Sequence, residues 1–232
     1  MAGFDGIEYD LVSEADEDYD ELQRIVGVAF QPMALHLPDL PLGLLEIGTG
    51  TGKTAIEVLK ISPQFFMYSV DISQERHKLA RVALTEYSDR VRLITEDIFC
   101  YLEANPNLVF DGAFSCLTLH NFPPNDRRSL LKTLHRNIWG GMPLVIGDKL
   151  AFDDPEEHKR VFDLHLERFS DYFIARGRED QLELWKEHYR QDDMVKWTRG
   201  QAIRDITDAG FRDVQLYWQK EDYLGAVITA RS

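Results

Sequence analysis

Short apolar runs alternate with longer stretches of mixed polarity through the middle of the chain. The apolar runs are nearly free of polar positions, which is typical of strands buried on both faces, and the intervening stretches carry apolar residues at helical spacing. The pattern predicts an α/β protein in which helices cover both faces of a parallel sheet. The expected strands span residues 44–47, 65–70, 91–95, 109–117, 144–146, 214–218 and 226–230, and the expected helices span 20–35, 55–61, 73–87, 126–139 and 200–209.

The helix expected after the second strand shows the local signals most clearly. Ser73 can cap its N-terminus, and the helix then extends to Tyr87. Leu79, Val82 and Ala83 recur at helical spacing. We therefore expect these three residues to form the stripe that packs on the sheet.

A charged and aromatic stretch at residues 152–198 interrupts the alternation of strands and helices. It predicts two or three amphipathic helices inserted before the last helix and two strands. Their apolar positions exceed what a short insertion can bury against a finished sheet, so we expect a homodimer interface there. The expected organisation is an N-terminal helical arm over the cofactor site (1–36), a core (37–150), a helical lid (151–198) and a C-terminal αββ unit (199–232).

Polar residues stand at the points where the predicted strands end. Glu46, Asp71 and Asp97 lie at or just after the first three strands, and the stretch 116–120 ends the fourth. In open α/β sheets, ligands bind at the carboxyl ends of the strands. The sequence therefore places a candidate binding site at this edge of the sheet.

The first strand runs into a glycine-rich loop, GTGTGKT at residues 48–54. A phosphate-binding P-loop needs a glycine where Ile47 stands, which disfavours that interpretation. A dinucleotide-binding loop that starts at Gly50 tolerates Ala55 at its third position, and Asp71 follows at the distance of a ribose-binding acid. That second interpretation stays open at this point.

A third interpretation rests on the pattern Glu-x-Gly-x-Gly-x-Gly at residues 46–52 and on the motifs that follow it. These are Val-Asp-Ile-Ser at 70–73, Glu-Asp-Ile at 96–98 and Phe-Asp-Gly-Ala-Phe-Ser-Cys at 110–116. In this ordered set the chain resembles a class I S-adenosylmethionine-dependent methyltransferase, by motif over residues 40–150 and by layout over most of the rest. The resemblance implies a Rossmann-like, seven-stranded, mostly parallel sheet and S-adenosylmethionine (SAM) as the cofactor.

The resemblance also implies roles for single residues. Glycines at 48 and 50 let the backbone approach the cofactor where a Cβ would clash. Asp71 can accept both ribose hydroxyls and Asp97 the adenine amino group, whereas turn or N-cap duty is the competing interpretation of both acids. Glu46 is expected to orient the loop more than to touch the ligand. The expected cofactor-site residues are Tyr19, Glu46, Gly48, Thr49, Gly50, Asp71, Ile72, Asp97, Ile98 and Cys116.

Outside the core, the layout is similar to that of the carboxy-S-adenosylmethionine synthase-like branch of this class. The similarity rests on Tyr-Asp-Glu-Leu at 19–22, the lid, and Asp-Ala-Gly-Phe at 208–211. In that branch, residues at the positions of Tyr19 and Cys116 touch the cofactor. Two departures favour ordinary methyl transfer: a cysteine replaces the branch's asparagine at 116, and only Arg190 stands near the place of the lid arginine that holds a cofactor carboxylate.

His120 is the candidate catalytic residue. It follows the fourth strand on the side where a methyl acceptor would lie, so it could take a proton from an O–H or N–H group. The competing interpretation is a histidine that hydrogen-bonds its own loop. Asp148 and Lys149, after the fifth strand, form a second acceptor-side candidate, and no cluster has the spacing of metal ligands, so no metal is expected. The lid aromatics to test are Trp185, Tyr189 and Trp197.

Composition narrows the expected partners. The chain of 232 residues has 40 acidic and 26 basic side chains and a net charge of −14, which disfavours a nucleic-acid substrate because phosphate binding needs positive charge. Two cysteines suit a reducing compartment, and neither a leader peptide nor a membrane-spanning run is visible, so we expect a cytoplasmic protein. The expected function is methyl transfer from SAM to an O or N atom of a small molecule. The alternatives are a synthase-like enzyme that modifies the cofactor, a non-catalytic adenosyl-binding protein and a nicotinamide oxidoreductase.

Overall fold

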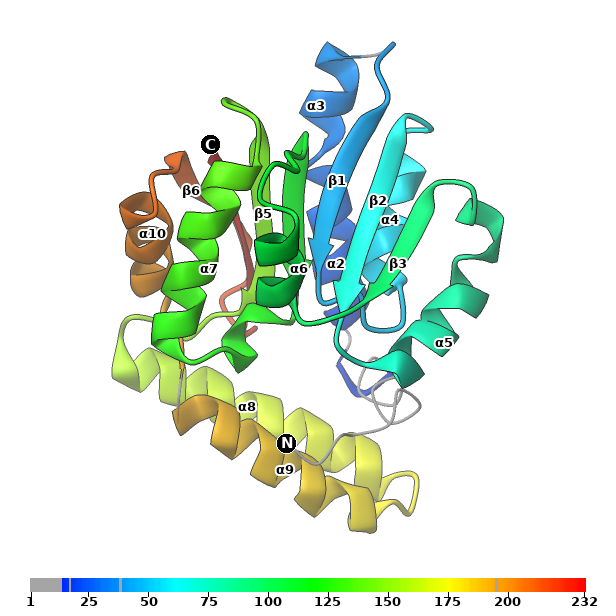
Figure 1. Ribbon diagram of the computed structural model, residues 1–232. Helices are drawn as coiled ribbons and strands as arrows, with labels where there is room; N and C mark the ends of the chain where they lie inside the picture. Colours follow the sequence, from blue (N-terminus) through cyan, green and yellow to red (C-terminus); the bar gives the residue numbers. More distant parts are fainter. Residues whose placement is uncertain (1–13, 17, 38, 195) are drawn as a thin grey trace.

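One seven-stranded sheet organises the computed structural model, which describes residues 14–16, 18–37, 39–194 and 196–232 (Figure 1). The strand order is β3-β2-β1-β4-β5-β7-β6, and β7 runs antiparallel to both of its neighbours, β5 and β6. The expected seven-stranded, mostly parallel α/β sheet is confirmed. The strands are β1 (Leu42–Ile47), β2 (Phe65–Asp71), β3 (Val91–Thr95), β4 (Gly112–Cys116), β5 (Pro143–Lys149), β6 (Arg212–Gln219) and β7 (Gly225–Arg231).

Helices cover both faces of the sheet because successive strand residues alternate between two apolar cores. Leu44 packs in the core under one set of helices, and Leu45 packs in the core on the opposite face. The first face carries α2 (Tyr19–Val28), α3 (Gln31–His36), α4 (Lys53–Ile61) and α5 (Gln74–Ala83), and the second carries α6 (Ile98–Ala104), α7 (Pro124–Asn137) and α10 (Arg199–Asp208). Short 3₁₀ turns are η1 (Thr85–Tyr87) and η2 (Leu119–Asn121).

Of the expected arm (1–36), residues 1–13 and 17 lie outside the described residues, and the helices α2 and α3 join the core of the molecule. A Cβ at Gly27 would lie 2.7 Å from the Glu57 carbonyl oxygen of α4, and a Cβ at Gly147 would lie 2.5 Å from the Val26 Cγ2 atom. Glycine at these two positions thus lets α2 pack closely against α4 and β5, where a Cβ would clash. The end of α2 that begins at Tyr19 still reaches the carboxyl edge of the sheet, where it lines the cleft described below.

The helix expected from Ser73 to Tyr87 is divided into α5 and η1. Ser73 caps it as expected, since its hydroxyl accepts the Arg76 backbone N–H at 3.2 Å. The expected apolar stripe is wrong: Leu79 and Val82 are exposed, and the helix packs through His77 and Ala80.

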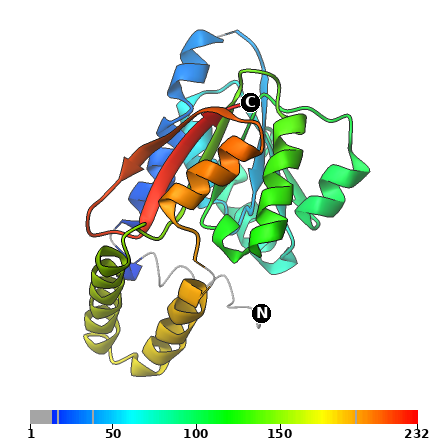
Figure 2. The same ribbon diagram turned by 90° about the vertical axis from the view of Figure 1, so that its left-hand side faces the viewer.

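The expected lid is a hairpin of α8 (Pro155–Ile174) and α9 (Glu179–Met194), which lies below the carboxyl ends of the parallel strands in Figure 1. Figure 2 shows the two helices side by side at one end of the molecule. Their aromatic side chains pack against each other in one cluster, which includes Phe169, Phe173, Trp185 and Tyr189. These aromatic positions are buried within one chain, so the homodimer stays a prediction that depends on the apolar residues still exposed on the hairpin, Ile174 and Leu184. Among the described residues, no helix is both long and apolar enough to cross a membrane.

Candidate active site

A cleft of about 470 Å³ opens at the carboxyl ends of the parallel strands. This volume lies in the range of small-molecule and cofactor sites. All the residues expected at the cofactor site line the cleft except Glu46, which lies beneath the loop. The lining residues from that set are Tyr19, Gly48, Thr49, Gly50, Asp71, Ile72, Asp97, Ile98 and Cys116.

The glycine loop has a left-handed backbone at its first two glycines. The φ angles of Gly48 and Gly50 are 80° and 54°. A Cβ at Gly48 would lie 2.1 Å from the Thr118 Oγ1 atom, whereas a Cβ at Gly50 would meet nothing within 4 Å. The protein itself therefore requires glycine at position 48, because the loop crosses the end of β4 there, while the cleft side of Gly50 remains open to a ligand.

Gly48→Ala is expected to destabilise the protein more than Gly50→Ala does. Both substitutions force an alanine into a left-handed conformation, at about 1–3 kcal/mol, but only Gly48→Ala also drives a Cβ into Thr118. Urea unfolding of the two variants without ligand measures the difference. Equal loss of stability in the two variants would show that the Thr118 side chain moves away from the new Cβ without any cost in free energy of unfolding.

Asp71 links the glycine loop to the end of β2. Its Oδ2 atom accepts the Gly50 backbone N–H at 2.8 Å, and its Oδ1 atom accepts the Ser73 backbone N–H at 2.9 Å. The carboxylate is nearly buried, and each oxygen keeps a further lone pair for a ligand hydroxyl. Asp71 therefore combines the turn role and the ligand-facing position that the sequence left as alternatives.

Asp97 caps a helix that the sequence analysis did not include. Its Oδ1 atom accepts the backbone N–H groups of Phe99 and Cys100 at 2.9 and 3.3 Å, and α6 starts directly afterwards. Asp97 still lines the cleft together with Ile98. The N-cap interpretation is thus observed, and it leaves the second carboxylate oxygen available on the cleft side.

Glu46 is enclosed below the loop and is only 1% exposed. Neither carboxyl oxygen makes a geometrically satisfactory hydrogen bond within the described residues. Burial raises the pKa of Glu46 to about 8, and the nearby charge of Asp71 acts in the same direction. Glu46 is therefore protonated near neutral pH, and it supports the loop from below without facing the cleft.

Glu46→Gln is expected to make stability less dependent on pH. The pKa of Glu46 rises from 4.5 to about 8 on folding, so between these values the folded state keeps a proton that the unfolded state has lost. Stability must then fall as pH rises through this window, by up to about 1.4 kcal/mol per pH unit. Urea unfolding from pH 5 to 8.5 should show this fall in the wild type and a smaller one in Glu46→Gln. Parallel curves would contradict the assignment.

Several residues that line the cleft were not among those expected at the cofactor site. Thr54 donates to the Gln23 side chain at 3.1 Å, which joins α4 to α2 at the wall of the cleft. The Lys53 ammonium lies 5.4 Å from the centre of the Tyr19 ring. Further lining residues are Arg76, Thr118, Asn121 and Phe122. Their positions depend on the packing of α2 and on the loop after β4, which a local pattern does not encode.

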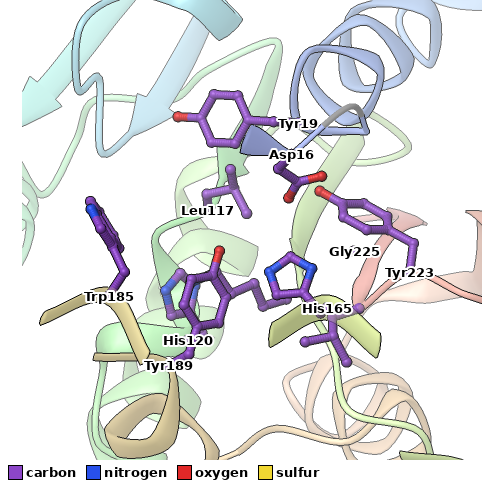
Figure 3. A pocket seen from close by; sticks show the side chains of 11 residues that line it. Asp16, Tyr19, Leu117, His120, His165, Trp185, Tyr189, Tyr223 and Gly225 are labelled. Carbon is purple, nitrogen blue, oxygen red and sulfur yellow. The ribbon is translucent and has the colours of Figure 1, made fainter. Parts of the chain in front are cut away.

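A second, smaller pocket adjoins the cleft on the side of the α8–α9 hairpin (Figure 3). Tyr19 and Leu117 line both cavities, so they stand at the junction. Leu117 has a φ angle of 52°, a conformation that L-residues rarely adopt outside functional sites and turns. At Leu117 the chain turns sharply after β4, so that His120, which follows, lines the smaller pocket.

His120 is held by Asp148 from the neighbouring strand. Its Nδ1 atom lies 2.5 Å from the Asp148 Oδ1 atom, and its backbone N–H donates to Asp148 Oδ2 at 3.1 Å. Because a carboxylate only accepts hydrogen bonds, Nδ1 carries the proton and Nε2 is the basic nitrogen of the neutral ring. Asp148 is fully buried, so this pair is shielded from solvent.

The loop that carries His120 is also supported from below. Buried Arg127, from α7, donates to the Leu119 carbonyl oxygen at 3.4 Å, and its guanidinium lies 4.3 Å from the centre of the Trp197 ring. Trp197 therefore belongs to the core beneath η2, whereas Trp185 and Tyr189 line the smaller pocket as lid aromatics. Arg190 is exposed on α9 and pairs with Glu187 at 3.9 Å.

The described part of the chain contains no candidate metal site. Within it, no group of three or more His, Cys, Asp or Glu side chains is placed to hold a metal ion. Cys116, at the end of β4, is buried, and its burial raises the thiol pKa. The thiol is neutral, so Cys116 is a packing contact at the cleft wall and not a nucleophile.

Comparison with known proteins agrees with the site geometry. Residues 44–139 match a family described as a methyltransferase domain. Over 232 residues the chain is 24% identical to a carboxy-S-adenosyl-L-methionine synthase from Psychromonas ingrahamii, a match that covers 96% of this chain and 88% of that protein. Among solved structures it is similar to the plantazolicin methyltransferase BpumL in complex with SAH, with a TM-score of 0.63, 14% identity, and coverage of 97% of this chain and 90% of that one.

A second solved structure, the CurJ carbon methyltransferase, has a TM-score of 0.65 and 19% identity, and the match covers 90% of this chain but 53% of that one. The chain thus spans about half the length of that structure. The sheet order and the solved structures show the fold of the class I SAM-dependent methyltransferases, and residues 44–139 match a methyltransferase domain. The chain is also 24–26% identical to several proteins named carboxy-S-adenosyl-L-methionine synthase. The third interpretation of the glycine loop is confirmed.

Proposed function

We propose that this chain transfers the methyl group of SAM to an O–H or N–H group of a small molecule. The observation that carries the proposal is the His120–Asp148 pair, which lies where the cofactor cleft adjoins the smaller pocket. A base held in one tautomer beside a methyl donor site can take the proton of a hydroxyl or amine acceptor. The net charge of −14 favours a small acceptor over a nucleic acid.

The cleft has the features needed to hold SAM. The left-handed glycine loop leaves open space on the cleft side of Gly50, and Thr49 has a buried hydroxyl without a partner among the described residues. Asp71 would accept the ribose hydroxyls, and Asp97 the adenine amino group, as charge-assisted hydrogen bonds. Ile98 would donate its backbone N–H to the adenine ring, while Tyr19, Ile72 and Cys116 would pack against the ligand.

When bound, SAM supplies an electrophilic methyl group on a sulfonium. His120 would remove the acceptor proton through Nε2, and Asp148 would stabilise the imidazolium that forms. The hairpin of α8 and α9 and the start of α2 enclose the smaller pocket, so they would exclude water and orient the acceptor. Much of the rate would come from this positioning.

Methyl transfer is tested by incubating the protein with SAM labelled on its methyl group and a pool of small metabolites. Formation of S-adenosylhomocysteine (SAH) together with a labelled product is expected. The matched control is Asp163→Asn, a change on the exposed face of α8 that leaves both cavities intact. Tight SAH binding without any labelled product from a broad pool would instead favour a non-catalytic adenosyl-binding protein.

Carboxy-SAM synthesis is the second candidate function, because the relatives that cover most of this chain carry that name. Against it, Arg190 lies on the exposed face of α9, and Cys116 stands where the family asparagine is expected. Mass spectrometry of the ligand that copurifies distinguishes the two candidates. SAH, the product of methyl transfer, supports the first candidate, and a cofactor heavier by one carboxyl group supports the synthase.

A homodimer and a cytoplasmic location are part of the same proposal. Ile174 and Leu184 are exposed on the hairpin, which favours a contact with a second chain. Both cysteines are unpaired, which suits a reducing compartment such as the cytoplasm. Light scattering at micromolar concentration should give the mass of two chains, and Leu184→Glu should shift it to one. A monomer in the wild type would end the dimer proposal without affecting the catalytic one.

A further inference from the structure

We propose that Lys149 and Tyr223 form a carboxylate subsite for the methyl acceptor, and that the side chain of Asp16 occupies this subsite in the structure. The inference rests on the proposed function, because it takes the smaller pocket as the acceptor site. It adds the chemical class of the acceptor: a planar acid that carries a hydroxyl or amine. Figure 3 shows the Tyr223 hydroxyl beside the Asp16 carboxylate in the pocket that His120 also lines.

Asp16 places a carboxylate from the chain itself inside the pocket. The charge of Lys149 and the Tyr223 hydroxyl both lower the pKa of this carboxyl group, so they favour its ionised form. The Asp16 Oδ1 atom accepts the Asp18 backbone N–H at 3.1 Å. Desolvation nevertheless outweighs these contacts and raises the pKa of Asp16 to about 6. The subsite therefore has groups that bind a carboxylate, but desolvation disfavours the ionised form of the Asp16 carboxylate that occupies it.

Tyr223 is fixed in place before any ligand arrives. The residue is 3% exposed, and its ring packs over Gly225 so closely that a Cβ there would lie 2.1 Å from the Tyr223 Cε1 atom. The Trp218 ring meets it edge-on at 6.1 Å between centroids. A buried hydroxyl on a ring that cannot turn away is a preorganised hydrogen-bond donor for an oxygen in the pocket.

Lys149 supplies the positive charge of the subsite. Its ammonium lies 4.0 Å from the centre of the Tyr189 ring, and its charge helps to lower the pKa of His165 to about 3, after burial as the larger cause. His165 is thus neutral, and its Nε2 atom has no hydrogen-bond partner within the described residues. One ammonium beside a neutral polar ring suits a singly charged oxyanion.

The present size of the pocket indicates that Asp16 must leave when an acceptor binds. The volume is about 20 Å³, enough for roughly one water molecule. The segment of Asp16 is tied to the hairpin by the Tyr172 hydroxyl, which donates to Glu14 at 2.6 Å, and to β6–β7 by Lys220, which pairs with Asp18. Both ties are partly exposed, so they cost little to break. The aromatic walls Tyr19, Trp185 and Tyr189 then favour a planar ligand.

Calorimetric titration of the SAH-saturated protein with benzoate and benzamide tests the subsite. Asp16→Asn, which keeps the size of the side chain and removes its charge, is expected to tighten benzoate binding at least tenfold. Lys149→Met and Tyr223→Phe are each expected to weaken it at least tenfold. None of these changes should alter benzamide binding to the same extent, and the matched control Asp163→Asn should leave both probes unaffected.

Two results would overturn the subsite. One is equal benzoate affinity in Asp16→Asn and Asp163→Asn. The other is binding of benzylamine that Asp16→Asn weakens, which would make Asp16 the recognition group for a cationic acceptor. Asp16→Ser repeats the test if the asparagine variant is unstable. SAH affinity is measured in the same titrations. If SAH still binds and either of these two results is obtained, only the subsite is overturned. If SAH does not bind, the proposed function is overturned.

Discussion

Asp71→Ala is expected to weaken SAH binding about 10- to 100-fold. The carboxylate holds the glycine loop through the Gly50 backbone N–H at 2.8 Å and presents its remaining lone pairs to the cleft. A lost charge-assisted contact of this kind costs about 1.5–3 kcal/mol. Calorimetric titration with SAH measures the effect directly, since SAH lacks the reactive methyl group and binds without turnover.

The control for this experiment is Asp89→Ala, an equal change of charge on the exposed surface between η1 and β3. It should leave SAH affinity unchanged. The unfolding temperature of Asp71→Ala without ligand shows whether the loop remains folded, because the substitution also removes the acceptor of the Ser73 N–H. Unchanged SAH affinity in a folded Asp71→Ala variant would refute the ribose assignment.

His120→Gln is expected to slow methyl transfer about 10²- to 10⁴-fold, the usual contribution of a general base. SAH affinity should stay the same, because the His120 side chain lines the smaller pocket and not the cofactor cleft. Asp148→Asn should give a similar loss, since an amide at 2.5 Å from Nδ1 favours the wrong tautomer of the ring. The readout is the rate at saturating SAM with the acceptor found in the labelling experiment.

The matched control is His36→Gln on the exposed end of α3, which Figure 1 shows at the end of the sheet opposite the carboxyl ends of the parallel strands. It should have no effect on rate or affinity. A His120→Gln enzyme with the wild-type rate would mean that positioning and exclusion of water suffice for this acceptor. The His120–Asp148 pair would then support the loop after β4, which is the competing interpretation of the sequence.

The sequence predicts the cofactor cleft well because that cleft is built from strand ends. A parallel sheet brings the residues that follow its strands to one edge, so Gly48, Asp71 and Asp97 can be placed together from local patterns. The sheet itself follows from the same apolar runs. What local patterns do not encode is the packing of α2, which depends on glycines at positions 27 and 147 that lie far apart in the chain.

The smaller pocket is harder to predict because distant segments meet there. His120 follows β4 and Asp148 lies in the neighbouring strand β5, but their pairing depends on the strained turn at Leu117, which no composition signal marks. Asp16 and Tyr223 come from opposite ends of the chain. The hairpin illustrates a related limit: amphipathic helices show that a face is buried, and α8 and α9 bury theirs against each other, whereas the sequence suggested a second chain.

Thermal unfolding with SAM, SAH or NAD tests the central claim most directly, namely that the cleft at the carboxyl edge of the sheet is a SAM site. At a concentration one hundred times the dissociation constant, a ligand stabilises the folded protein by about 2.7 kcal/mol. For a chain of this length that corresponds to a rise of roughly 5–10 °C in the unfolding temperature. The account predicts this rise with SAM and SAH, no rise with NAD, and its loss in Asp71→Ala. A rise with NAD, or none with SAM and SAH, would contradict it.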